Sequence, residues 1–257
     1  MQFRFSLLLL PVLFAGLVQA QTATSTYEPT VGQEGKDVVW VPTPQAVVDK
    51  MLDMAKVTPN DFVMDLGSGD GRTVITAAKR GARALGIEYN SDMVELSKRN
   101  AEKAGVADRA QFMKADLFET DFSKATVITM FLLPDINLKL RPKILKLKPG
   151  TRVVSNSFTM GDWQADETSE VSASKGCENS WCTALLWIVP AQVGGTYQVP
   201  EGEVTLKQTY QMLSGTMRAG GKTFALKGKV NGEEISFSAG GKQYKGRLNG
   251  KQLELAS

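Results

Sequence analysis

The sequence contains no histidine and only two cysteines among its 257 residues. Many hydrolases use an imidazole as a general base or as part of a catalytic triad, so this absence disfavours their mechanisms. Two thiols without an imidazole also offer few ligands for zinc, and we expect no metal site. In-line displacement reactions depend on alignment and desolvation more than on a strong acid or base, and they are compatible with this composition.

The sequence also lacks a basic run. Lysine and arginine are scattered along the chain, and the formal net charge is +3. Nucleic-acid binders carry clustered positive charge, so we expect no nucleic-acid partner.

No apolar run is long enough for a membrane-spanning helix, which needs roughly 20 residues. The longest, from Leu7 to Val18, is interrupted by Pro11. Arg4 precedes this run and the small-residue site Val18-Gln19-Ala20 ends it, a pattern typical of a secretory signal peptide. We therefore expect residues 1–20 to be removed and the protein to be periplasmic or secreted by a bacterium. No membrane contact is expected after cleavage.

The two cysteines, Cys177 and Cys182, lie in one short segment. A close pair of cysteines in an oxidising compartment usually forms a disulfide bond. The loop that this bond closes is short, so its stabilising effect falls below the roughly 3 kcal/mol of a 15-residue loop. We predict a disulfide that acts as a local clamp.

The chain divides into four parts. Residues 1–20 are the signal peptide, residues 21–37 form a flexible lead-in, and residues 38–189 form an α/β domain in which strands and helices alternate. Residues 190–257 form a small antiparallel β unit of about five or six strands, with hairpin turns at Asn231-Gly232 and Asn249-Gly250. In the α/β domain the expected strands are residues 62–66, 84–88, 110–114, 125–130 and 151–155, followed by a hairpin at 170–173 and 181–189.

A glycine-rich loop follows the first expected strand, with the spacing Gly67-x-Gly69-x-Gly71. Such a loop lets backbone amides approach a ligand closely. Two acidic residues, Asp65 and Asp70, would repel a pyrophosphate but suit a ligand with ammonium and sulfonium charges. Glu88 ends the second strand, where an acidic side chain can bind both hydroxyl groups of a ribose.

Three segments resemble motifs of class I S-adenosylmethionine-dependent methyltransferases. Val63 to Arg72 is similar to motif I, Gly86-Ile87-Glu88 to the acidic motif of the second strand, and Ala115-Asp116-Leu117-Phe118 to the motif beside the adenine. The resemblance implies a Rossmann-like sheet with helices on both faces and S-adenosyl-L-methionine as cofactor. The cofactor-binding residues implied by it are Thr43, Asp65, Gly67, Ser68, Gly69, Asp70, Gly71, Glu88, Asp116 and Leu117.

Within that class the chain resembles the branch that contains a histone-lysine methyltransferase and the small mitochondrial lysine methyltransferases. The segments Trp40-Val41-Pro42-Thr43-Pro44 and Phe131-Leu132-Leu133-Pro134 carry this resemblance. The second segment lacks the Asn/Asp-Pro-Pro-aromatic quartet of many DNA methyltransferases. The resemblance implies an amine acceptor, either an amine-bearing small molecule or a protein lysine.

The acceptor should approach the carboxyl ends of the fourth and fifth strands, where ligands bind in open α/β sheets. The expected catalytic residues there are Phe131, Pro134, Asp162 and Trp163. Phe158 follows the fifth strand as well, and aromatic faces with one acid would suit a lysine chain. The alternative for Phe131 and Trp163 is ordinary core packing.

The sequence is compatible with two other functions. The chain could be a non-catalytic ligand-binding or interaction protein on a methyltransferase scaffold, because no sequence feature explains a supply of S-adenosylmethionine outside the cytoplasm. The intact glycines and Glu88 favour the enzyme. NAD-linked oxidoreduction is disfavoured by the glycine spacing.

Overall fold

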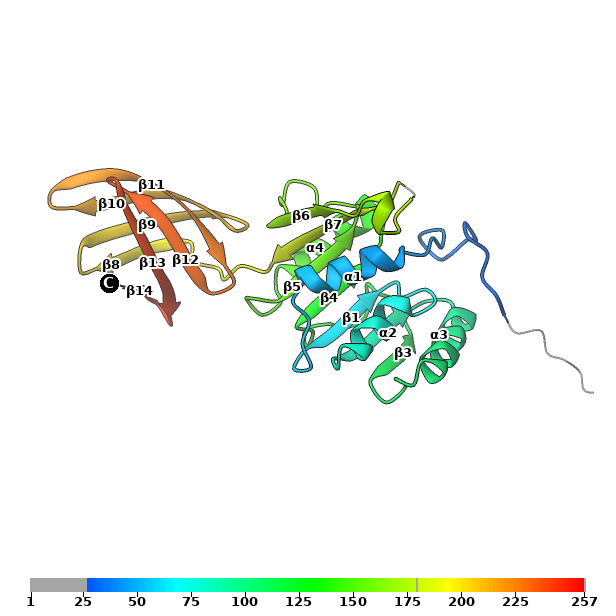
Figure 1. Ribbon diagram of the computed structural model, residues 1–257. Helices are drawn as coiled ribbons and strands as arrows, with labels where there is room; N and C mark the ends of the chain where they lie inside the picture. The colour runs from blue at the N-terminus through cyan, green and yellow to red at the C-terminus, as the bar shows by residue number, and fades with distance from the viewer. Residues whose placement is uncertain (1–26, 179, 257) are drawn as a thin grey trace, which may run out of the picture.

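The computed structural model describes residues 27–178 and 180–256, which form two β-sheets (Figure 1). The predicted signal peptide, residues 1–20, lies outside the described residues. Within the described ranges, no helix combines the length and the apolar character that a membrane crossing requires.

The first sheet has the strand order β3-β2-β1-β4-β5-β7-β6. Strands β1 to β5 are parallel, and β7 runs antiparallel to both β5 and β6. This is the Rossmann-like arrangement that the alternating pattern predicts. The strands are β1 (Phe62–Leu66), β2 (Arg83–Glu88), β3 (Ala110–Lys114), β4 (Val127–Met130), β5 (Arg152–Asn156), β6 (Glu167–Glu170) and β7 (Thr183–Ile188).

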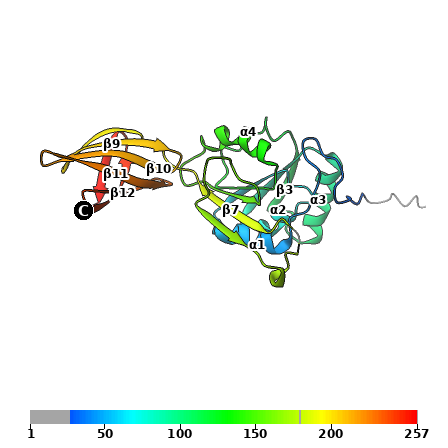
Figure 2. The same ribbon diagram turned by 90° about the horizontal axis from the view of Figure 1, so that it is seen from above.

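Helices cover both faces of this sheet, as Figure 2 shows for α1 and α4. Three helices bury apolar stripes in a core cluster on one face, and the fourth packs into a separate cluster on the other face. They are α1 (Gln45–Met54), α2 (Arg72–Lys79), α3 (Ser91–Lys103) and α4 (Pro134–Ile144). Because β1 and β4 lie between the two layers, their side chains are apolar and buried almost throughout.

The second sheet is a seven-stranded meander, one or two strands more than the sequence indicated. The additional strand is β8, whose polar residues, including Thr196 and Gln198, make its alternation weak. Its edge strands β8 and β14 approach each other, so the meander curls around its own apolar core. The strands are β8 (Gly195–Val199), β9 (Gly202–Thr209), β10 (Met212–Ala219), β11 (Lys222–Asn231), β12 (Glu234–Ala239), β13 (Lys242–Asn249) and β14 (Gln252–Ala256).

Polar contacts join the two units. The Tyr210 hydroxyl donates a hydrogen bond to Asp162 over 3.0 Å, and Lys229 forms an ion pair with Asp166 at 2.6 Å. The chain enters the second unit after Ile188, which pairs with Arg152 at the start of β5. The meander is therefore attached at the amino ends of the parallel strands.

The segment before residue 38 differs from the expected flexible lead-in. The amide of Gly32 donates to the carbonyl of Trp40 over 2.8 Å, and the amide of Trp40 donates to that of Gln33 over 2.9 Å. Glu34 and Val39 also form an isolated β-bridge. These bonds satisfy the backbone of a turn that has no apolar periodicity, which explains why the sequence pattern missed it. Residues 27–37 therefore include an ordered turn.

Candidate active site

A deep pocket opens at the carboxyl ends of β1, β2 and β4. Its floor is the loop between β1 and α2, and its remaining walls come from the turn at residues 33–43 and from the segments after β2, β3, β4 and β5. Most of the predicted cofactor-binding residues line this pocket: Thr43, Asp65, Gly67, Ser68, Gly69, Asp70, Glu88, Asp116 and Leu117.

The glycine loop needs glycine because its backbone is left-handed and closely covered. Gly67 and Gly69 have φ values of 78° and 53°. A Cβ atom on Gly67 would lie 3.0 Å from the Leu132 side chain, and one on Gly69 would lie 2.6 Å from Trp40 Nε1. Any side chain would therefore strain the backbone and fill the pocket.

Gly71 has a different position from the other predicted glycines. It precedes α2 with a φ of 82°, and a Cβ atom there would lie 2.7 Å from the ring of Phe112. Gly71 therefore supports the loop from within the core and does not line the pocket. Its prediction as a cofactor-binding residue is corrected to a packing role, since the loop turns inward at this residue.

Glu88 fixes the shape of the glycine loop. Its Oε2 atom accepts a hydrogen bond from the Gly69 amide over 2.9 Å, and its Oε1 atom accepts one from the Asn90 amide over 2.9 Å. Each carboxylate oxygen can accept a further bond, so both remain available to a ligand hydroxyl pair. The position at the end of β2 matches the sequence prediction.

Asp65 is buried beneath the same loop, with 5% of its surface exposed. Burial raises the pKa of its carboxyl group to about 7, opposed by a hydrogen bond from the Thr129 hydroxyl and reinforced by the charges of Glu88 and Asp70. The Thr129 Oγ1 to Asp65 Oδ1 distance is 2.5 Å. A positively charged ligand would favour the ionised form of this group.

Two other pocket carboxylates are already paired. Arg72 binds Asp70 at 2.6 Å and also donates to the Thr43 carbonyl over 2.9 Å. Lys36 pairs with Asp116, and this contact lowers the pKa of the Asp116 carboxyl group. In the described part of the chain, neither Asp65 nor Glu88 belongs to an ion pair. The surplus of negative charge therefore lies beside the glycine loop.

This donor set fits S-adenosylmethionine. The cofactor carries a positively charged sulfur and an ammonium group, which suit the acidic floor, and it carries a ribose with two hydroxyls, which suits Glu88. Asp116 and Leu117 line the pocket beyond β3, beside Tyr89. The Lys36 ammonium lies 4.9 Å from the centroid of the Tyr89 ring, so the turn at residues 33–43 closes this side.

Three aromatic rings also line the pocket, and we call Phe131, Phe158 and Trp181 the aromatic slot. The ring centroids of Phe131 and Phe158 are 5.8 Å apart, and Trp181 lies 6.0 Å from Phe131 and 5.2 Å from Phe158. All three are half-buried. They come from the segments that follow β4 and β5 and precede β7. Phe131 thus lies where the sequence predicted it.

Trp163 was expected at the acceptor rim, and the structure contradicts this. Its side chain is fully buried in the core layer beneath α4, where it stacks on Tyr210 with centroids 5.9 Å apart. Its carbonyl accepts a hydrogen bond from Trp187 Nε1 over 2.8 Å. The chain reverses at Gly161, which has a φ of 67°, and returns to the core before it reaches Trp163.

Asp162 and Pro134 also lie away from the pocket lining. Asp162 pairs with Arg141 at 2.5 Å and accepts from Tyr210, so its charge serves the contact between the two units. Pro134 is exposed at the first position of α4, where its fixed φ and missing amide hydrogen suit a helix start. Both catalytic predictions are therefore corrected.

Sequence reasoning missed Trp181 in particular. Because β7 is antiparallel to β5, the residues before β7 lie beside the residues after β5, and Asn156 pairs with Ala184. The predicted hairpin contained this signal. The distance along the chain from β5 favoured Trp163 instead, because the reversal at Gly161 has no strong pattern.

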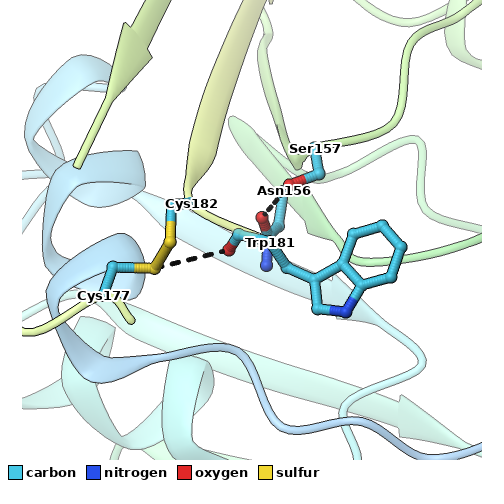
Figure 3. The surroundings of a disulfide bond; sticks show 5 residues. All are labelled: Asn156, Ser157, Cys177, Trp181 and Cys182. Carbon is cyan, nitrogen blue, oxygen red and sulfur yellow. Dashed lines mark hydrogen bonds between the residues drawn. A yellow bond between two sulfur atoms is a disulfide. The ribbon is translucent and has the colours of Figure 1, made fainter. Parts of the chain in front are cut away.

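The predicted disulfide between Cys177 and Cys182 is present, with Cα atoms 5.8 Å apart. It closes the loop that carries Trp181 (Figure 3). Cys177 is 3% exposed and belongs to the core cluster beneath α1, with Cys182 packed against it. The bridge is therefore a local clamp next to the pocket.

Comparison with known proteins gives a consistent set of relatives. The profile of the ANTKMT methyltransferase domain matches residues 65–167. A protein-lysine N-methyltransferase of Saccharolobus islandicus is 50% identical over 137 residues, which are 52% of this chain and 85% of that protein. A human lysine N-methyltransferase named for the C subunit of ATP synthase is 30% identical over 195 residues, which are 72% of this chain and 83% of the relative.

A solved structure is also similar. A crystal structure from Salinibacter ruber, described as an RNA methyltransferase in complex with S-adenosyl-L-homocysteine, is 47% identical. The structural match covers 60% of this chain and 96% of the Salinibacter ruber chain, with a TM-score of 0.55.

Proposed function

The chain belongs to the small protein-lysine N-methyltransferase family of class I S-adenosylmethionine-dependent methyltransferases, and we propose that it methylates the ε-amino group of a lysine in a protein outside the cytoplasm. One observation carries the choice of acceptor. The aromatic slot lines the same pocket as the acidic glycine loop, because Phe131 follows β4 beside the end of β1, where the loop begins. A flexible amine can enter such a slot, whose faces attract a cation within about 6 Å.

S-adenosylmethionine supplies a methyl group on a positively charged sulfur, which makes that methyl carbon electrophilic. Glu88 would hold the ribose, Asp65 would balance positive charge from below the loop, and Asp116 would bind on the adenine side. The aromatic slot excludes water and aligns the acceptor amine, and alignment is a large part of such a barrier. The amine must be neutral when it reacts, so the ammonium form that enters the slot has to lose its proton before the transfer.

The location outside the cytoplasm is supported by two observations. The first is the N-terminal pattern of Arg4, an apolar run and a small-residue cleavage site. The second is the Cys177–Cys182 bridge, since disulfides persist in oxidising compartments. The contacts at Glu88 and Asp65 favour a functional cofactor site over a non-catalytic scaffold.

The experiment uses the mature chain with radiolabelled S-adenosylmethionine and a periplasmic protein extract from the producing bacterium. We expect label on protein, and acid hydrolysis should release methylated lysine. A matched extract whose lysines have been acetylated is the control. Cell fractionation of the full-length chain tests its location separately.

Purified RNA from the same cells forms a parallel reaction. Label in RNA and none in protein would contradict the proposed acceptor and leave the cofactor site intact. Failure to bind S-adenosylmethionine by calorimetry would favour the non-catalytic alternative. Retention of the full-length chain in the cytoplasm would overturn the proposed location alone.

A further inference from the structure

The third wall of the aromatic slot is attached to the disulfide. Trp181 directly precedes Cys182, and the sulfur of Cys177 lies 3.8 Å from the Trp181 carbonyl oxygen (Figure 3). We propose that Trp181 is a specificity-determining residue for the acceptor amine and that the Cys177–Cys182 bridge helps to hold it in the slot. This inference rests on the proposed function and names the residue that selects its acceptor.

The two sides of the slot are supported in different ways. Phe131 and Phe158 follow central strands of the sheet directly, and the Ser155 hydroxyl donates to the Phe158 carbonyl over 2.8 Å. Their positions are therefore set by the sheet itself. Trp181 instead belongs to a loop that starts at the short 3-10 helix Ala173–Lys175 and ends at β7.

That loop is fixed at its far end by the sheet. The Val171 amide donates to the Cys182 carbonyl over 2.8 Å, and the Ser157 amide donates to the Thr183 carbonyl over 2.7 Å. Its near end is fixed by the bridge, which ties Cys182 to the buried Cys177 beneath α1. Opening the bridge removes the side-chain tie at Cys182, the residue after Trp181, while the backbone bonds of Cys182 and Thr183 to the sheet remain.

Loss of Trp181 from the slot should affect acceptor binding and not cofactor binding. The Trp181 centroid is within 6.0 Å of both phenylalanine rings, so removing it leaves a two-sided groove. The cofactor residues Asp65 and Glu88 are held by β1, β2 and their own hydrogen bonds. We therefore expect the KM for the acceptor to rise while cofactor affinity stays unchanged.

The direct test compares the oxidised chain with the chain treated with an excess of a small dithiol. Two electrons and two protons pass from the dithiol to the bridge, leaving Cys177 and Cys182 as thiols and the reagent as a disulfide. The KM for a lysine substrate should rise on the order of 2- to 30-fold, the range of one cation–π contact. The Kd of S-adenosylmethionine by calorimetry should change less than twofold.

Variants show whether the bridge acts through Trp181. Trp181→Ala should match the reduced chain, and reduction should have no further effect on it. Trp181→Phe should keep most of the affinity for the acceptor and remain sensitive to reduction. The pair Cys177→Ser with Cys182→Ser should match the reduced chain without any reagent. Subtracting the tryptophan fluorescence of Trp181→Phe from that of the parent chain gives the emission of Trp181. Quenching of this emission by acrylamide should increase on reduction.

The outcomes separate this inference from the proposed function. If the oxidised parent chain binds cofactor but transfers no methyl group to lysine, the proposed function fails. If it is active, and either reduction or Trp181→Ala leaves the acceptor KM unchanged, the inference fails. A further effect of reduction on Trp181→Ala would also overturn it, because the bridge would then act through another residue. Denaturation midpoints for each form identify loss of folding.

Discussion

The carboxylate of Glu88 accepts a hydrogen bond from the backbone amide of Gly69, with 2.9 Å between oxygen and nitrogen. The residue that ends β2 therefore sets the conformation of the loop after β1. Since the second oxygen accepts from Asn90, one side chain orders both segments that face the predicted ribose.

Replacing Glu88 by glutamine should weaken S-adenosylmethionine binding about 10- to 150-fold, because hydrogen bonds to a charged group contribute about 1.5–3 kcal/mol. The amide cannot accept on both atoms, so one backbone N–H loses its partner. Isothermal titration calorimetry measures the change. Glu102→Gln on the exposed side of α3 is the matched control. An unchanged Kd would place the ribose elsewhere.

Cofactor binding should depend on pH around neutrality. The pKa of Asp65 is raised to about 7 by burial, so this carboxyl is mostly neutral at pH 6 and mostly ionised at pH 8. A cationic ligand binds the ionised form more tightly, so the Kd should fall as the pH rises through 7. Binding at pH 7 should also release protons.

Calorimetry in two buffers of different ionisation enthalpy measures this release. In Asp65→Asn the proton release and the pH dependence of the Kd should both disappear. A Kd that does not vary between pH 6 and 8 in the parent chain would contradict a titration of Asp65 that is coupled to cofactor binding.

Removing the charge of Lys36 should tighten binding of a cationic ligand. Lys36 forms a partly exposed pair with Asp116 at the pocket wall, and such pairs have small effects. We expect Lys36→Met to lower the Kd of S-adenosylmethionine by up to about fivefold. S-adenosylhomocysteine lacks the sulfonium charge, so its affinity should increase less in this variant. Equal gains for both ligands would contradict an electrostatic origin, and Lys98→Met on α3 is the control.

Trp163 should matter for folding and not for acceptor recognition. Its side chain is fully buried, so Trp163→Ala should lower the free energy of unfolding by about 3–5 kcal/mol. Chemical denaturation measures this loss. The acceptor KM, determined on the folded fraction, should stay at its parent value. A selective rise of this KM with unchanged stability would restore Trp163 to the acceptor site.

The turnover rate should increase with pH. A lysine with a pKa near 10.4 is almost fully protonated at neutrality, and only the neutral amine reacts. At saturating cofactor, the rate should rise close to tenfold per pH unit until the amine in the slot is half neutral. Initial rates between pH 7 and 9.5 test this, and a flat profile would mean that product release limits turnover.

The cofactor half of the pocket was readable from the sequence because it is local. Asp65, Gly67 and Gly69 belong to one strand-loop-helix unit, and Glu88 lies at the end of the next strand. A parallel sheet brings such strand ends to one edge, whichever helices separate them. Position along the chain was then sufficient to place these side chains.

The acceptor half depends on how the chain turns after the last parallel strand. Phe131 follows β4 directly and was placed correctly, whereas Trp163 and Trp181 lie 7 and 25 positions after Asn156, the last residue of β5. Which of them faces the pocket is decided by the left-handed turn at Gly161 and by the antiparallel return of β7. Neither has a periodic signature, and both tryptophans lie in polar stretches of the sequence, Trp163 between Asp162 and Gln164 and Trp181 after Ser180.

The attachment point of the second unit determines how the protein can be handled. The meander joins the amino ends of the parallel strands, and the pocket opens at their carboxyl ends. With five residues in β5, these ends are separated by about 17 Å. A solid support coupled through β8–β14 would hold the pocket mouth turned outward to the solution. The second unit is therefore a suitable site of attachment for oriented immobilisation. A pocket that faces the solution stays accessible to large protein substrates.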